Sequence, residues 1–204
     1  SCRKQEIATV EEETFVRDLG EIRKTGKLIV VTDFNSINYF IYKGQPLGFQ
    51  YEILQELSDR LDLEIEVKVN NDLEKNFANL VEGKVDLIAS NLTISKERKE
   101  IAEFTIPHSQ TRQVLVQKKA ETRKPFAEVK ELIRNPLELS GKTVYVQQNS
   151  SHALRLQNLA EEIGENINIV EVPIDTEQLI RMVSRGDIDY TVADEDIARV
   201  NNSY

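Results

Sequence analysis

The sequence predicts an α/β fold of two similarly built lobes, each a mostly parallel sheet with helices on both faces. Short apolar runs typical of strands alternate along the chain with amphipathic helical patterns, which favours parallel strands joined by helices. The 204 residues suffice for two modest cores, and 40% hydrophobic with 30% charged residues is ordinary for a globular protein. A net charge of -9 argues against a nucleic-acid surface or an anionic membrane face.

The chain also repeats itself in outline. Gly26–Val31 reads Gly-Lys-Leu-Ile-Val-Val, and Gly141–Val146 reads Gly-Lys-Thr-Val-Tyr-Val. Leu80–Leu87 and Met182–Tyr190 each read as the end of a helix, a glycine stop and an aspartate that leads into a strand. Two such pairs predict two lobes that present strand ends to a shared cleft.

The first lobe is predicted element by element from hydrophobic spacing. We expect these elements in chain order: helix Phe15–Lys24, strand Leu28–Thr32, helix Phe49–Leu61, strand Leu63–Val69, helix Leu73–Val81 and strand Leu87–Ala89. Phe49, Ile53, Leu57 and Leu61 recur every fourth residue, so we expect them to form the buried face of their helix. Strand Leu63–Val69 alternates apolar and charged residues, as a half-buried strand does.

The second lobe follows the same alternation. Phe104–Pro107 turns the chain towards a crossover strand. The stretch Glu121–Leu139 is charged and interrupted by prolines, so we expect it to be peripheral, with one helix within Phe126–Arg134. We expect these further elements: strand Gln113–Gln117, strand Lys142–Val146, helix His152–Ile163, strand Ile167–Val172, helix Thr176–Ser184, strand Tyr190–Ala193 and helix Asp194–Val200.

A candidate carboxylate site follows the strand Leu87–Ala89. Ser90, Asn91 and Thr93 stand where that strand leaves the carboxyl edge of the sheet, which is where open α/β sheets bind ligands. Arg98 lies one helical turn past Ser95, a candidate N-cap, and its guanidinium fork matches a carboxylate. The alternative is that Ser90–Ser95 only caps a helix while Arg98 pairs with a neighbouring glutamate in solvent.

These residues resemble a known family, the type 2 periplasmic solute-binding proteins, and within it the family 3 branch that binds amino acids. The resemblance covers Leu19–Val200 and rests on four motifs: strand-ending Asp33, Gly48-Phe49-Gln50-Tyr51-Glu52-Ile53, the block from Ser90 to Arg98, and Phe104-Thr105-Ile106-Pro107. The opening Asp18–Leu28 also resembles the binding module of the membrane-bound lytic transglycosylase F subfamily.

The resemblance implies a role for each matching residue. The ligand's α-carboxylate would be held by Arg98, Ser90 and Thr93, and its α-amine by Asp194. Further donors would come from the loop of the second lobe, at Asn149, Ser150 and Ser151. Asn91 and Asn149 are larger than the residues that the family more often has there, so they would bear on ligand size.

Other candidates carry an alternative reading beside the ligand role. Asp33 would contact the ligand's amine or side chain, or else form an Asx turn, and Asp194 would equally suit a helix start. Of Tyr39 and Phe40 we expect one to stack on the ligand, with Tyr39 the candidate, and one to be core. His152 is expected near the cleft and His108 in a structural place; no metal-ligand spacing joins them, and no cofactor is expected.

The two ends of the chain suggest part of a larger, anchored protein. We expect a flexible tether over 1–18, lobe 1 over 19–112, lobe 2 over 113–200, and the start of a return crossover over 201–204 whose C-terminal elements are missing. Cys2, the only cysteine, would be lipidated at the outer membrane, or else is incidental.

The predicted function is therefore that of a periplasmic binding or sensor module for a small zwitterionic ligand, an amino acid or a peptidoglycan-derived peptide. Its partner would be a fused or associated transglycosylase domain, or alternatively an ABC permease. The sequence contains no nucleophile elbow, phosphate loop or zinc signature. The remaining alternative is a dehydratase on the same scaffold, with Asp194 or Glu195 as general acid or base.

Overall fold

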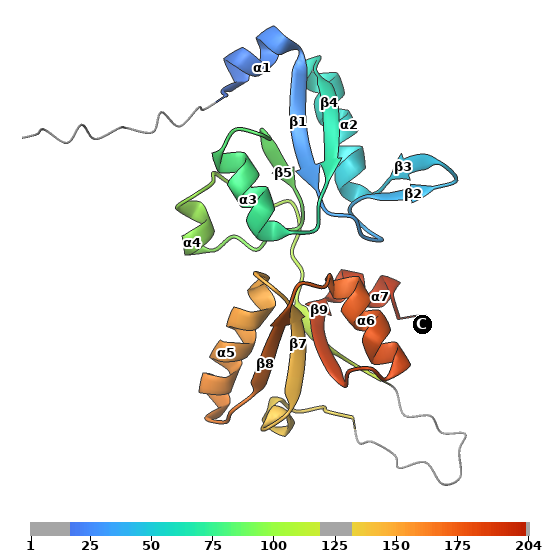
Figure 1. Ribbon diagram of the computed structural model, residues 1–204, viewed down its shortest axis with the longest axis vertical. Coiled ribbons are helices and arrows are strands. Elements are labelled where there is room, and N and C mark those ends of the chain that lie inside the picture. Colours follow the sequence, from blue (N-terminus) through green and yellow to red (C-terminus); the bar gives the residue numbers. More distant parts are fainter. Residues whose placement is uncertain (1–16, 119–131, 203–204) are drawn as a thin grey trace, which may run out of the picture.

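The computed structural model of the protein describes residues 17–118 and 132–202, which form two α/β lobes joined by the irregular segment 102–112 (Figure 1). The predicted α/β class with mostly parallel sheets and flanking helices is confirmed. The start of the predicted helix Phe15–Lys24 and most of the helix predicted within Phe126–Arg134 lie outside the described residues.

Lobe 1 is built on a three-stranded parallel sheet in the order β4-β1-β5. Its elements are α1 (Leu19–Thr25), β1 (Lys27–Thr32), β2 (Phe40–Tyr42), β3 (Gln45–Leu47), α2 (Phe49–Leu61), β4 (Glu64–Val69), α3 (Leu73–Val81), β5 (Leu87–Ala89) and α4 (Lys96–Lys99). The β2–β3 pair is an antiparallel hairpin outside the main sheet. The Asp18 carboxylate starts α1, because it accepts a 3.0 Å hydrogen bond from the Glu21 N–H.

Lobe 2 holds a four-stranded sheet in the order β6-β9-β7-β8, in which only β6 runs antiparallel to its neighbour. Its elements are β6 (Gln113–Gln117), the 3-10 helix η1 (Pro136–Leu139), β7 (Thr143–Gln147), α5 (Ser151–Ile163), β8 (Asn168–Val172), α6 (Thr176–Arg185), β9 (Tyr190–Asp194) and α7 (Glu195–Val200). Helices α5 and α6 provide the crossover connections that parallel strands require.

The internal repeat inferred from the sequence is present in the topology. The order β4-β1-β5 in lobe 1 recurs as β8-β7-β9 in lobe 2, so the central strands β1 and β7 correspond. Gly83 follows α3 with φ 67°, and Gly186 ends α6 with φ 87°. A left-handed glycine therefore follows each helix before the third strand of its lobe.

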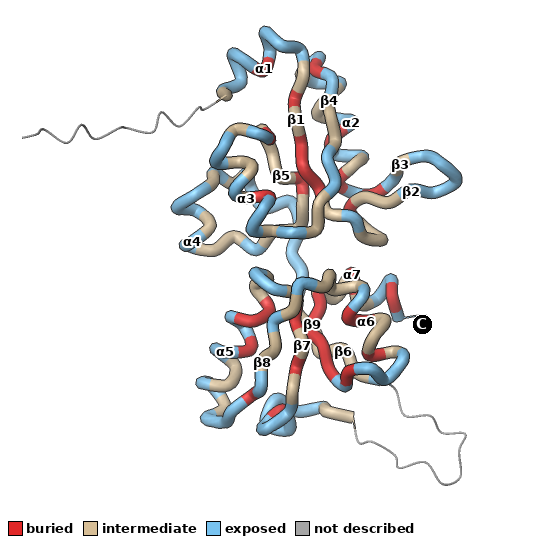
Figure 2. Tube along the Cα trace, in the orientation of Figure 1, coloured by how far each residue is buried: buried red, intermediate tan, exposed pale blue. Residues whose placement is uncertain are grey.

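Each lobe has its own core along its central strand (Figure 2). In lobe 1, Val30 and Leu54 are buried against Leu28 and Ala89. In lobe 2, Val144 and Val146 are buried against Leu156 and Tyr190. None of the helices among the described residues is long and apolar enough to cross a membrane.

The predicted buried face of α2 is wrong at its N-terminal half. Phe49 and Ile53 are 43% and 38% exposed, whereas Leu54 is 1% exposed and packs in the core beside Leu57 and Leu61. A spacing of four residues drifts about 40° per step around a helix of 3.6 residues per turn. Leu54, Leu57 and Leu61 keep to one stripe, and Phe49 and Ile53 fall outside it.

The predicted strand Leu63–Val69 is half-buried only over its first part. Leu63 is buried, and Ile65 and Val67 pack against the core, but Val69 is 46% exposed. β4 lies at the edge of its sheet and pairs only with β1. The edge position leaves the end of the strand open to solvent.

Candidate functional site

The carboxyl ends of strands from both lobes meet at one cleft, which encloses about 810 Å³ of empty space including its open mouth. Asp33 follows β1, Ser90 follows β5, Gln147 ends β7 and Asp194 ends β9, and all four line this cleft. Parallel strands present their carboxyl ends at one edge of a sheet, where α/β folds bind ligands. The repeat thus supplies two such edges that face each other.

Arg98 extends from α4 to the boundary between the lobes. The Ser95 hydroxyl caps α4 by accepting from the Arg98 N–H at 3.3 Å. The guanidinium donates to the Thr93 carbonyl at 3.0 Å and, across the cleft, to the Asn149 carbonyl at 3.2 Å. Burial lowers the pKa of Arg98 from its ordinary value, as desolvation of a cation does. The sequence left open whether Arg98 lies in a ligand site or pairs with a neighbouring glutamate in solvent. The structure places Arg98 inside the cleft.

Hydroxyl groups from both lobes meet beside Arg98. Thr93 Oγ1 and Ser151 Oγ lie 3.0 Å apart across the cleft. Gln113 Nε2 donates to the same Ser151 oxygen at 3.0 Å. Ser150 Oγ instead donates to the Gln147 carbonyl at 2.6 Å, where it holds the loop that precedes α5.

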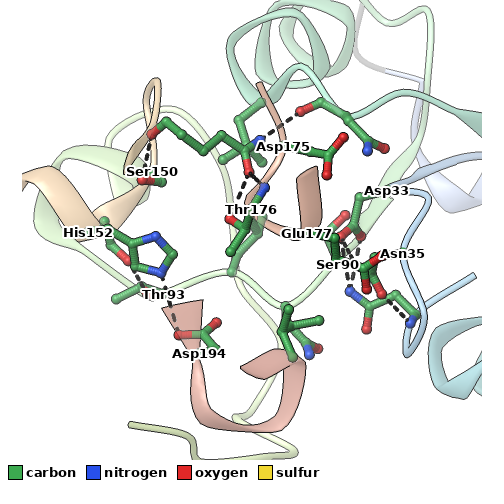
Figure 3. A pocket seen from close by; sticks show the side chains of 18 of the residues that line it. Asp33, Asn35, Ser90, Thr93, Ser150, His152, Asp175, Thr176, Glu177 and Asp194 are labelled. Atoms are coloured by element: carbon green, nitrogen blue, oxygen red, sulfur yellow. Dashed lines mark hydrogen bonds and ion pairs between the residues drawn. The ribbon is translucent and has the colours of Figure 1, made fainter. Parts of the chain in front are cut away.

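Asp194 and His152 form the opposite wall, contributed by lobe 2 (Figure 3). Asp194 occupies the N-cap position of α7, but its carboxylate makes no capping hydrogen bond. Its Oδ1 lies 3.7 Å from His152 Nε2. His152 is 6% exposed, and its Nδ1 is buried without a hydrogen-bond partner among the described residues. The Asp194 carboxylate therefore keeps acceptor oxygens at the cleft.

Asp33 lies at the other end of the cleft, among neutral donors. Its carboxylate accepts from Asn38 Nδ2 at 3.1 Å to each oxygen, and from the Asn35 side-chain amide. Burial raises the pKa of Asp33, and the hydrogen bonds from Asn38 oppose that shift. The Asx turn is made by Asn35, whose Oδ1 accepts from the Ile37 and Asn38 N–H groups at 2.9 and 2.7 Å.

A clasp between the lobes, which the sequence did not predict, adjoins Asp33. Glu177 in the first turn of α6 accepts from the Ser36 N–H at 2.8 Å and from the Ser36 hydroxyl. Asn201 Nδ2 donates to the same Glu177 oxygen at 3.2 Å. An acidic residue in a first helical turn is common for dipole reasons alone, so this contact could not be predicted from the sequence.

Nine of the eleven predicted ligand residues line the cleft: Asp33, Ser90, Asn91, Thr93, Arg98, Ser150, Ser151, His152 and Asp194. Their roles towards a ligand remain predictions. The cleft lining also includes residues that the prediction missed: Phe34, Asn35, Asn38, Asn71, Leu73, Leu92, Gln147, Asp175, Thr176, Glu177 and Ile197. Several of these lie in loops after predicted strands, where polar residues are too common to single out.

Tyr39 and Asn149 are the two predicted residues that do not line the cleft. Tyr39 packs edge-on against Phe34 and Tyr51, with ring centroids 6.5 and 5.7 Å away. Phe34, and not Tyr39, lines the cleft. Asn149 bridges the lobes, because its side-chain amide donates to Glu74 Oε2 at 3.1 Å. Cys2 lies outside the described residues.

Glu195, weighed as a general acid or base, is engaged elsewhere. It accepts from Arg112 at 2.6 and 2.8 Å and from Arg199 at 3.2 and 2.8 Å. Hydrogen bonds from Arg112 and then Arg199 lower the pKa of Glu195 from 4.5 to about 2. A carboxylate held ionised in this way is poorly matched to proton transfer near neutral pH. Among the described residues, no group of three or more His, Cys, Asp or Glu could hold a metal ion.

Comparison with known proteins gives one family for this chain. The family model described as "Bacterial extracellular solute-binding proteins, family 3" matches residues 27–155. A curated relative, membrane-bound lytic murein transglycosylase F of Desulfosudis oleivorans, is 32% identical over 189 residues, which are 93% of this chain and 39% of the relative. The chain thus spans about 39% of the length of that relative.

Solved structures show the same fold. Holo ArgBP from T. maritima aligns with a TM-score of 0.75 and 24% identity, covering 91% of this chain and 76% of that protein. An ancestral amino acid-binding protein, described as a precursor of cyclohexadienyl dehydratase, aligns with a TM-score of 0.73 and 25% identity over 90% of this chain and 77% of its own. The predicted resemblance and the prediction of a binding module are confirmed by these matches.

Proposed function

Because the chain belongs to the bacterial extracellular solute-binding proteins of family 3, we propose that its cleft binds a free amino acid or a short cell-wall peptide. The supporting observation is that Arg98 of lobe 1 and Asp194 of lobe 2 line the same cleft. A cation and an anion so placed complement the α-carboxylate and the α-ammonium of a zwitterion. These two charges come from different lobes.

The carboxylate replaces backbone carbonyls as the acceptor for Arg98. The guanidinium already presents two N–H groups to acceptors, Thr93 O and Asn149 O, and a charged oxygen pair accepts more strongly than neutral carbonyls. The hydroxyls of Thr93 and Ser151 complete the carboxylate site from the two lobes. Binding at this point joins the lobes, so ligand binding and lobe closure are coupled.

The ammonium is received by Asp194. Its carboxylate makes no capping hydrogen bond, so its oxygens remain acceptors for the ligand's N–H groups. His152 Nε2 stands 3.7 Å from this carboxylate.

The binding module serves as a sensor within a longer, transglycosylase-like protein. The curated relative that shares 32% identity carries the name of a membrane-bound lytic murein transglycosylase, which favours this role over that of an ABC transporter receptor. The same name and the extracellular family favour a periplasmic place, with Cys2 as the lipid anchor at the outer membrane. Closure on a peptidoglycan-derived ligand would regulate the cell-wall enzyme.

A thermal-shift screen against the twenty amino acids and a set of peptidoglycan stem peptides tests the binding proposal. A ligand of the folded state raises the unfolding midpoint according to its concentration over its dissociation constant. In Arg98→Ala the affinity is expected to fall about 100-fold, because hydrogen bonds to charged groups contribute about 1.5–3 kcal/mol each. The shift should therefore vanish.

The matched control is Arg155→Ala, which removes an arginine on α5 that pairs with Glu162 at 2.8 Å. This control should keep the full shift. An Arg98→Ala protein that folds and still binds with undiminished affinity would refute the proposal.

A further inference from the structure

We propose that Phe77 of α3 is a positioning residue for Arg98: the face of its ring holds the guanidinium in the orientation in which Arg98 receives the ligand's carboxylate. The inference rests on the proposed function and deepens it by adding a residue that acts on the ligand only through another side chain. Arg98 lines the cleft, whereas Phe77 stands behind it and outside the lining.

The ring of Phe77 and the guanidinium of Arg98 are at the distance of a cation–π contact. Arg98 Cζ lies over the ring, 5.7 Å from its centroid. A guanidinium within about 6 Å of an aromatic centroid is attracted by the negative face of the ring. Helices α3 and α4, which carry the two residues, lie next to each other in lobe 1 (Figure 1). Because both residues belong to one lobe, this contact does not depend on lobe closure.

Arg98 needs support that leaves its charge available. Its hydrogen-bond acceptors among the described residues are two neutral carbonyls, of Thr93 and Asn149. Burial lowers the pKa of Arg98, because desolvation disfavours the cation. A guanidinium has five N–H donors, and an aromatic face attracts the cation without taking up a donor along the fork. The ring therefore stabilises the cation and leaves N–H groups free for a ligand.

Helix α3 gives the Phe77 ring a fixed base. The preceding residue, Asn76, is fully buried, and its side-chain amide donates to the Asn70 carbonyl at 2.9 Å and accepts from Asn70 Nδ2 at 2.7 Å. The Asp72 carboxylate caps the helix by accepting from the Lys75 N–H at 3.1 Å. These bonds attach the first turns of α3 to the loop that follows β4.

The internal repeat shows what the position of Phe77 does in lobe 2. Gly186 lies 103 residues after Gly83, and the same offset pairs α3 with α6. It places Ile180 at the position of Phe77. Ile180 is 4% exposed and packs with Ile197 of α7, the helix that follows β9 as α4 follows β5. The position supports the helix at the cleft in both lobes, through an apolar side chain in one and a guanidinium in the other.

The variant Phe77→Leu removes the ring and keeps a large apolar side chain. Calorimetric titration at pH 7 uses the amino acid or stem peptide that raises the unfolding midpoint most, together with its α-carboxamide. The acid is expected to bind about two- to tenfold more weakly to this variant, because Arg98 must then be ordered on binding. The carboxamide lacks the charge that Arg98 binds, so its affinity should change much less. A general loss of structure would weaken both alike.

Two further variants locate the effect in the ring. Phe77→Tyr keeps an aromatic face and should keep the ratio of acid affinity to carboxamide affinity. Phe49→Leu is the matched control, since it removes a ring of α2 that contacts His108 at 5.7 Å between centroids. This control should leave the ratio unchanged.

A double-mutant cycle measures the contact without any ligand. Phe77→Leu, Arg98→Met and the double variant are unfolded in urea and compared with the unaltered chain. The two substitutions are expected to couple by about two- to fivefold in the unfolding equilibrium constant, as a cation–π contact near the surface does. Strictly additive effects would overturn the proposed contact.

An acid-to-carboxamide ratio that is unchanged in Phe77→Leu would overturn the positioning role and leave the proposed binding intact. A Phe77→Tyr protein that loses as much of the ratio as Phe77→Leu would equally overturn it. Binding of no amino acid or stem peptide by the unaltered chain would contradict the proposed function itself, and the role of Phe77 in binding with it.

Discussion

At the scale of single residues, Glu195 ties the crossover strand to the last helix. Its carboxylate accepts from Arg112, which directly precedes β6, and from Arg199 on α7. Its N–H also donates to the Arg112 carbonyl at 2.9 Å. These contacts anchor α7 and β9, which carries Asp194, to the segment that joins the two lobes.

The Glu195 ion pairs predict a pH dependence of stability. A carboxylate whose folded-state pKa is about 2 rather than 4.5 stabilises the fold above pH 4.5, and this contribution is lost as the pH falls from there towards 2. The Glu195→Gln variant lacks this stabilising contribution at every pH. The difference in unfolding midpoint between the two proteins should shrink below pH 4.5 and vanish near pH 2.

Because these groups are solvent-accessible, the difference at neutral pH should be small. Glu161→Gln serves as the control. The difference in unfolding midpoint between this variant and the unaltered chain should not shrink and vanish between pH 4.5 and pH 2. A Glu195→Gln difference that is constant from pH 7 to 2 would show that the ion pairs contribute nothing.

Residues of the cleft were predictable where a residue type is rare and its chemistry specific. Arg98 stands alone after a strand end and could be found from its chemistry, whereas Asp194 was assigned through the family resemblance. Asn38 and Glu177 could not, because one is a loop amide and the other an acid in a first helical turn, both common in any sequence. The place of Glu177 at the cleft depends on its contact with Ser36, 141 residues away.

At the scale of elements, α2 tests which helical face lobe 1 buries. Leu54→Ala should destabilise the chain by about 2–5 kcal/mol, because it removes a buried side chain and leaves a cavity. Ile53→Ala on the same helix should cost far less, since Ile53 is 38% exposed. Urea unfolding followed by circular dichroism measures both, and equal losses would contradict the assigned face.

Element identities were predictable from the sequence because strands and helices alternate with clear periods and glycine stops. The buried face of α2 was not, since a four-residue spacing fits a helix only over about two turns before it drifts away. The exposure of Val69 likewise depends on β4 being an edge strand, which is a property of the sheet order and not of the strand. Local patterns specify an element, whereas burial depends on its neighbours.

At the scale of the whole molecule, the two lobes are held face to face by polar contacts across the cleft. Ser36 joins Glu177, Asn71 accepts from Gln147 at 3.1 Å, and Arg98 joins Asn149 at 3.2 Å. Under the proposed function, ligand exchange would require these contacts to break, with the motion at the crossover between the lobes. The internal repeat was predictable from glycine and aspartate spacings, and these cross-lobe pairs were not.

The central claim is that one ligand is held by both lobes at once, through Arg98 of one and Asp194 of the other. Calorimetric titration with the best-binding amino acid, its carboxamide and its N-acetyl derivative measures both contacts directly. The carboxamide removes the charge that Arg98 binds, and acetylation removes the charge that Asp194 binds. Each change is expected to weaken binding at least about 30-fold, given about 1.5–3 kcal/mol per charged hydrogen bond. A carboxamide or an N-acetyl derivative that binds as tightly as the parent amino acid would contradict recognition by both lobes.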